Sequence, residues 1–96
     1  MVVVDHEPYG WFLLRDGSGY ILDVNCSQSF VSFSVVLRLN LEESVLVDAQ
    51  GHSATLELAR SIQHSPTKYH SRHGGPELES ASLAAIKGWQ ANRPAA

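Results

Sequence analysis

Residues 31–39 carry the feature that most constrains the fold, an alternation of apolar and mostly polar side chains. The odd positions hold Val31, Phe33, Val35, Leu37 and Leu39, and the even positions hold Ser32, Ser34, Val36 and Arg38. Successive side chains of a β-strand point to opposite faces of a sheet, so this period of two predicts a strand with one buried face. The chain must therefore form a sheet in which other strands pair with this one.

The apolar period changes to about 3.6 at Asn40, which predicts that helices follow this strand. Asn40 and Glu43 have the spacing of a capping box, so we expect a helix over 41–50. Gly51 should end that helix, because glycine readily adopts the left-handed C′ conformation. A second helix with a narrow apolar stripe is expected over 53–63.

The N-terminal part reads as a β-hairpin. Residues 9–15 and 20–25 are short and rich in apolar and aromatic side chains, and the turn residues DGSG lie between them at 16–19. Residues 2–4 are a candidate for a further strand. The prediction is an α+β fold, with a small antiparallel sheet of three to four strands and about three C-terminal helices packed on one face.

The C-terminal third has no apolar period before Pro76. Pro66 and the pair Gly74-Gly75 predict that 64–75 is a long irregular loop, which should contribute little to folding. The third helix should begin at Pro76, a residue that suits the first helical position. Residues 91–96 should fray, and the whole of 1–96 should form one domain.

The composition is that of a globular protein, with 44% hydrophobic and 18% charged residues. The N-terminus lacks the basic and apolar regions of a secretory signal, and no apolar run approaches the roughly 18 residues that a membrane span needs. A cytoplasmic protein without membrane contact is expected. Cys26 is the only cysteine, so no intrachain disulfide can form, and we expect this thiol to act as a small buried apolar group.

Three histidines in the 64–75 segment form the best candidate for a metal site. His64, His70 and His73 could supply three imidazole ligands and leave an open coordination position, as in a metal-assisted hydrolase. The spacing matches no established zinc motif, and the segment has no helix to hold the rings together. Neither a G-x-S-x-G elbow nor a phosphate-binding glycine loop occurs. A protein without enzymatic activity, metal or cofactor is therefore favoured, with the hydrolase as the alternative.

The same segment is also a cationic region on an acidic chain. It contains Lys68 and Arg72 and no acid, whereas the formal net charge of the chain is −3. That net charge argues against nucleic-acid binding. The candidate contact residues for an acidic protein partner are Lys68, Tyr69, His70, Arg72 and His73, helped by imidazoles that gain charge as the pH falls. A solvated loop without a partner is the alternative interpretation.

The sheet offers two further candidate surfaces. Ser32, Ser34 and Arg38 share the polar face of their strand and could contact a partner. In the first hairpin strand, Trp11 and Phe12 point to opposite faces, so both faces are apolar. A folded-back helix, the N-terminal segment, a protein partner or a second copy in a homodimer could cover the second face.

The segment YILDVNCSQSF, followed by a strand and helices, gives the chain a general resemblance to small bacterial proteins with a hairpin-led sheet and C-terminal helices. These include some immunity proteins, which neutralise a cognate toxin. The resemblance assigns no functional residue. It implies a small domain that works by binding, and so neutralising or regulating, a partner protein.

Overall fold

The computed structural model describes residues 1–8, 10–17, 19–28 and 31–92, and their strands form one antiparallel sheet. Its strands are β1 (Val2–Glu7), β2 (Trp11–Asp16), β3 (Gly19–Gln28) and β4 (Val31–Arg38). Each strand pairs with the next one in the sequence, so β1 and β4 are the two edges. The α+β class, the hairpin and the strand at 2–4 are confirmed, although Tyr9 and Ser18 lie outside the described residues.

The helices follow the sheet in the order expected. They are α1 (Leu41–Gln50), α2 (His52–His64), the 3₁₀ helix η1 (Pro66–Arg72) and α3 (Gly75–Ala91). The capping box of α1 is present: Asn40 Oδ1 accepts from the Glu43 N–H at 2.9 Å, and Glu43 Oε1 accepts from the Asn40 N–H at 2.9 Å. Gly51 ends α1 with φ at 63°, a positive value that glycine adopts without strain.

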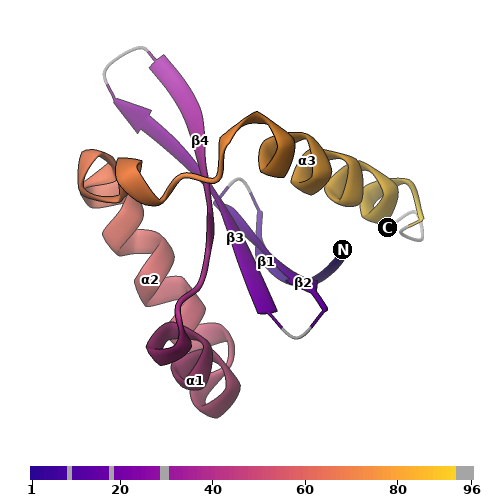
Figure 1. Cartoon of the computed structure of the whole chain (residues 1–96), viewed down its shortest axis with the longest axis horizontal. Helices are drawn as coiled ribbons and strands as arrows, with labels where there is room; N and C mark the ends of the chain where they lie inside the picture. The colour runs from indigo at the N-terminus through magenta and orange to yellow at the C-terminus, as the bar shows by residue number, and fades with distance from the viewer. Residues whose placement is uncertain (9, 18, 29–30, 93–96) are drawn as a thin grey trace.

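Helices cover both faces of the sheet, so the prediction that they pack on one face is wrong. Figure 1 shows α1 and α2 on one side of the strands and α3 on the other. Each side has its own apolar core. The core under α1 and α2 includes Trp11, Leu22, Leu37, Val47 and Ile62, and the core under α3 includes Leu14, Ile21, Val36, Leu78 and Ile86.

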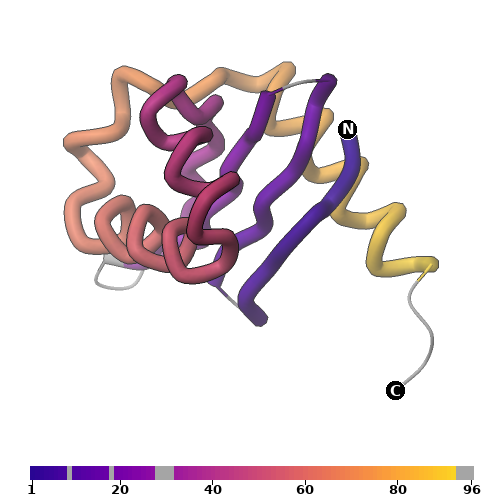
Figure 2. Tube along the Cα trace, turned by 90° about the horizontal axis from the view of Figure 1, so that it is seen from below, coloured from indigo at the N-terminus to yellow at the C-terminus, as the bar shows by residue number. Residues whose placement is uncertain are grey.

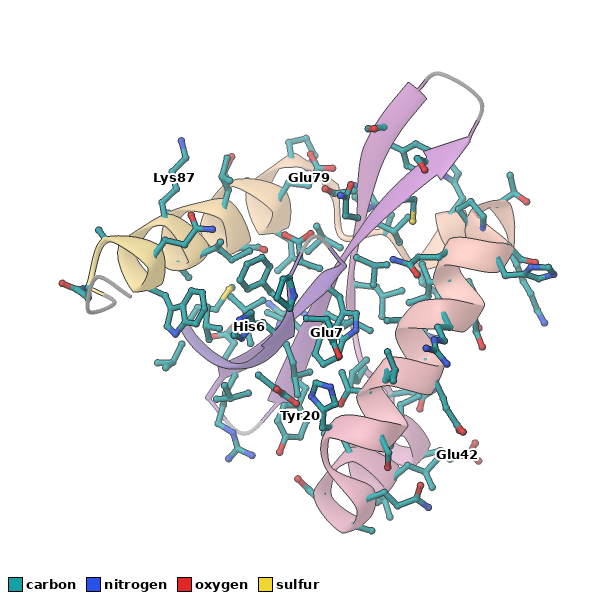
Figure 3. All side chains as sticks on the ribbon, turned by 180° about the vertical axis from the view of Figure 1, so that it is seen from behind. His6, Glu7, Tyr20, Glu42, Glu79 and Lys87 are labelled. Atoms are coloured by element: carbon teal, nitrogen blue, oxygen red, sulfur yellow. The ribbon has the colours of Figure 1, made fainter. Side chains whose placement is uncertain are left out.

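The two cores explain why β2 is apolar on both faces. Trp11 and Leu13 point toward α1 and α2, whereas Leu14 and Phe12 belong to the core under α3. Successive side chains of the neighbouring strand β1 also contact helices on opposite faces of the sheet (Figure 3). Glu7 contacts His52 of α2, and the ring of His6 contacts that of Trp89 of α3, with centroids 4.7 Å apart. A helix of the chain itself therefore covers the second apolar face, and no second copy is needed to bury it.

The segment 64–75 is not an irregular loop, which corrects the prediction from its composition. His64 is the last residue of α2, and η1 continues from Pro66 to Arg72 along the β4 edge, opposite β1 (Figure 2). Pro66 is buried, and Tyr69 packs against the core under α1 and α2. These long-range contacts, which composition does not reveal, stabilise the short helix.

The C-terminal helix ends close to its predicted position. α3 extends to Ala91, so this first residue of the expected frayed tail is helical, and residues 93–96 lie outside the described part. Among the residues that the structure describes, no helix is long and apolar enough to cross a membrane.

Candidate functional site

A pocket between β4 and η1 brings together residues from two of the predicted surfaces. Its volume is about 280 Å³, and its walls combine apolar residues of both elements with two histidines: Phe33, Ser34, Val35, Pro66, Thr67, His70 and His73. No acidic residue is among these lining residues. The predicted contact residues Ser34, His70 and His73 therefore belong to one site.

The position of η1 follows from its own sequence. Pro66 occupies the start of the helix, where its fixed φ and missing N–H have no cost, and its ring is buried. Tyr69 anchors the helix on the core beneath α1 and α2. Lys68 and His70, on either side of Tyr69, are exposed. The helix therefore presents the imidazole of His70 to the pocket, and it has an exposed cation, Lys68, two residues earlier.

Arg72 ties η1 to α1. Its guanidinium donates to both carboxylate oxygens of Glu43, at 2.9 and 2.6 Å, and also to the carbonyl oxygen of Arg38 at 3.0 Å. The hydrogen bonds from Arg72 lower the pKa of Glu43, and those with Glu43 raise the pKa of Arg72. The charge of Arg72 is thus neutralised within the fold.

His73 holds the outer edge of β4. Its Nδ1 accepts a hydrogen bond from the Val36 N–H at 3.1 Å, so the neutral ring carries its proton on Nε2. Nε2 lies 2.7 Å from an oxygen of Glu79, near the start of α3 (Figure 3). Both ring nitrogens have partners within the chain. Arg72 and His73 are therefore held by contacts within the chain. Thr67 and His70 are the exposed polar residues of η1 that line the pocket, and Lys68 is exposed between them in the sequence.

The polar face of β4 is open only in part. Ser32 and Ser34 are exposed, whereas Val36 on the same face is buried under α3. Arg38 is also exposed and pairs with Asp16 at 3.3 Å. Both groups of that pair are accessible to solvent, so the pair contributes little to stability. The end of the β3–β4 hairpin extends past the helices in Figure 1.

The structure does not assemble the predicted metal site. Within the described residues, which include His64, His70 and His73, no group of three His, Cys, Asp or Glu side chains is placed to hold a metal ion. His64 is exposed at the end of α2, whereas His73 is engaged by Val36 and Glu79. The spacing of these histidines along the chain therefore does not become a ligand set.

Cys26 is a buried side chain, as expected. It is 1% exposed and belongs to the core under α1 and α2. Burial raises the pKa of its thiol, and the nearby carboxylate of Asp23 raises it further. A protonated, inaccessible thiol is a poor nucleophile.

Two polar contacts have no counterpart in the sequence predictions. His52, at the start of α2, lies between two carboxylates of β1, 2.9 Å from Asp5 and 3.0 Å from Glu7. Ser82 of α3 is fully buried and donates to Asp23 at 2.6 Å. Asp5 and Glu7 are two residues apart, a spacing that places them on one face of a strand. Nothing local indicates that His52 meets them.

Comparisons of the chain with protein-family models, curated proteins and solved structures find no match. The candidate site is therefore defined by its geometry alone.

Proposed function

We propose that this chain is a small protein-interaction module without enzymatic activity, and that it binds a partner protein through the pocket between β4 and η1. The observation that carries the proposal is the composition of this site: apolar walls from Phe33, Val35 and Pro66, with the exposed imidazole of His70 in the lining. Lys68 is exposed two residues before His70 on η1. An apolar centre with a polar rim is typical of protein interfaces.

The charges beside the site support an acidic partner surface. Lys68 has no acidic partner among the described residues, in contrast to Arg72, which pairs with Glu43. A cation on η1, the helix that forms one wall of this pocket without acidic lining, attracts carboxylates and speeds their approach. Binding would neutralise or regulate the partner by covering part of its surface.

We also propose that the protein is cytoplasmic and that it binds no metal ion. The fold has a single cysteine, which is buried and free, so it needs no oxidising compartment. The hydrolase alternative gains no support, because the described residues place no three metal-binding side chains together.

Capture of a partner from the native cell extract, compared among charge-reversal variants, tests the proposal. The double variant Lys68→Glu, His70→Glu should lose the partner that the unmodified chain retains. Lys87→Glu is the control for a charge reversal away from the site, because Lys87 is exposed on α3 and points away from the sheet (Figure 3). If the double variant captures as much partner as the unmodified chain, the proposed site is wrong. If Lys87→Glu loses as much capture as the double variant, the loss is an effect of net charge and not of the site.

A further inference from the structure

The outer edge of β4 is occupied along only half of its length. The Val36 N–H donates to His73 Nδ1 at 3.1 Å, and the Val36 carbonyl accepts from the Gly74 N–H at 2.8 Å. Arg72 donates to the Arg38 carbonyl at 3.0 Å. From Val36 onward, the chain itself therefore satisfies the groups at the edge of the sheet.

In the other half of this edge, the direction of the backbone N–H and C=O groups can be inferred from the alternating hydrogen-bond pattern of an antiparallel sheet. Val36 is opposite Asp23 and its backbone groups point away from β3, so the pairs Ser34–Asn25 and Ser32–Ser27 have the same orientation. The N–H and C=O groups of Ser32 and Ser34 thus face outward. Within the described part of the chain, no element bonds to them on that side.

The pocket adjoins this open half. Phe33 and Val35 contribute to it from β4, and Pro66 and His70 contribute from η1. Its volume of about 280 Å³ is just below the range of about 300–1,000 Å³ that is usual for small-molecule sites. A pocket of this size has room for one apolar side chain of a longer ligand.

We propose that the open edge of β4 binds an extended segment of the partner protein as an additional strand. This inference rests on the proposed function and specifies its mode of recognition. The backbone of the segment pairs with Ser32 and Ser34, and one of its apolar side chains enters the pocket. Strand addition of this kind combines backbone hydrogen bonds for affinity with side-chain pockets for specificity.

The charges beside the pocket define the segment further. Side chains two residues apart lie on the same face of a strand. The residue two positions from the apolar anchor of the bound segment therefore points to the same side as the anchor, toward η1. His70 lines the pocket, Lys68 is exposed two residues earlier on η1, and no acid lines the pocket. The segment is therefore expected to place Asp or Glu two positions from its apolar anchor. The contacts of Val36 with His73 and Gly74 stop the added strand from extending further.

The test uses a display library of random 12-residue peptides selected on the whole chain. The enriched peptides should share an apolar residue with an acid two positions away. A synthetic peptide of this kind should slow the exchange of the Ser32 and Ser34 amide hydrogens. Slower exchange that is confined to other amides, or the absence of any enriched peptide, would overturn the inference.

A pair of substitutions at one residue separates backbone pairing from other contacts. Ser34→Pro removes an N–H that faces outward, a position where an edge strand tolerates proline, and should weaken peptide binding about tenfold or more. Ser34→Ala keeps the N–H and removes only the hydroxyl group, so it should weaken peptide binding far less than Ser34→Pro does. Circular dichroism checks that both variants fold, and the amide exchange of the unmodified chain decides the matter if Ser34→Pro does not fold.

The two proposals fail separately. If the captured partner depends on Lys68 and His70 but binds Ser34→Pro unchanged, strand addition is wrong and the proposed function stands. If light scattering shows a dimer that Ser34→Pro dissociates, the edge pairs with a second copy, and the inference of a partner segment is overturned.

Discussion

Arg72 of η1 and Glu43 of α1 are joined by two hydrogen bonds, and Glu43 also accepts from the backbone that begins its own helix. One carboxylate thus caps α1 and fixes η1 beside β4. The Glu43 side chain is 16% exposed and that of Arg72 is 31% exposed, so solvent screens the pair only in part. This contact joins η1, which forms one wall of the pocket, to the start of α1.

Arg72→Ser should destabilise the fold by about 1–3 kcal/mol, because it leaves a largely buried carboxylate without its charged donor. Lys68→Ser, four residues earlier on the same helix, should change the free energy of unfolding by no more than about 0.5 kcal/mol, as for an exposed side chain. Urea unfolding of both variants measures the difference. Equal stability of the two would mean that the Arg72 contacts contribute nothing.

The lowered pKa of Glu43 predicts a loss of stability in acid. A carboxyl group whose pKa is lower in the folded state stabilises that state above its unfolded value, here the ordinary 4.5, and loses this contribution as the pH falls through the folded value. The stability advantage of the unmodified chain over Glu43→Gln should therefore shrink below about pH 4.5. Thermal unfolding from pH 6 to 3 measures it. A constant difference would contradict the assignment.

The stability contributed by His52 should change with pH in the opposite direction, because it is lost as the pH rises. Its hydrogen bonds with Glu7 and then Asp5 raise its pKa above 6.5, so the contact stabilises the fold below 6.5 and weakens as the pH rises through the folded value. The advantage of the unmodified chain over His52→Gln should be larger at about pH 5.5 than at about pH 8.5. It should amount to a few degrees at most in Tm, because the groups are exposed. An advantage that grows with pH would contradict it.

Trp11→Ala should cost about 3–5 kcal/mol, because Trp11 is 2% exposed in the core beneath α1 and α2. Its ring also contacts His52, with centroids 5.1 Å apart. Denaturant unfolding gives the value. A loss below about 1 kcal/mol would place the indole outside the core.

Patterns over short stretches of the sequence correctly predicted the features that are determined by residues close together in the chain. The alternation along β4, the capping box at Asn40 and the burial of Cys26 all follow from residue type and short spacing. The doubly apolar β2 also indicated that a second layer must cover the sheet. The sequence could not show that α3 is that layer, because its apolar stripe fits either face.

The site was less predictable because its contacts join distant parts of the chain. Arg72 and Glu43 are 29 residues apart, and His73 and Val36 are 37 apart. Charge and composition singled out the 64–75 segment, and His70 and Ser34 do line one pocket. The same signals also selected Arg72 and His73, whose intramolecular partners no local pattern reveals.

The joint between α1 and α2 provides the last prediction. Gly51 has φ at 63° and ψ at −131°, a combination that residues with a Cβ strongly disfavour. A Cβ built at Gly51 meets no atom within 4 Å, so Gly51→Ala probes the backbone conformation without a steric clash. It should destabilise the fold by about 1–3 kcal/mol.

Gly88→Ala is the matched control for Gly51→Ala. Gly88 lies within α3 with negative φ, and a Cβ there also meets nothing within 4 Å. Alanine should stabilise the chain by about 0.4–1 kcal/mol at this position, because it restricts the unfolded state and favours helix. The same substitution should therefore have opposite signs at two open positions, which urea unfolding of both variants measures. A neutral Gly51→Ala would show that the joint between the helices relaxes to a conformation that alanine adopts freely.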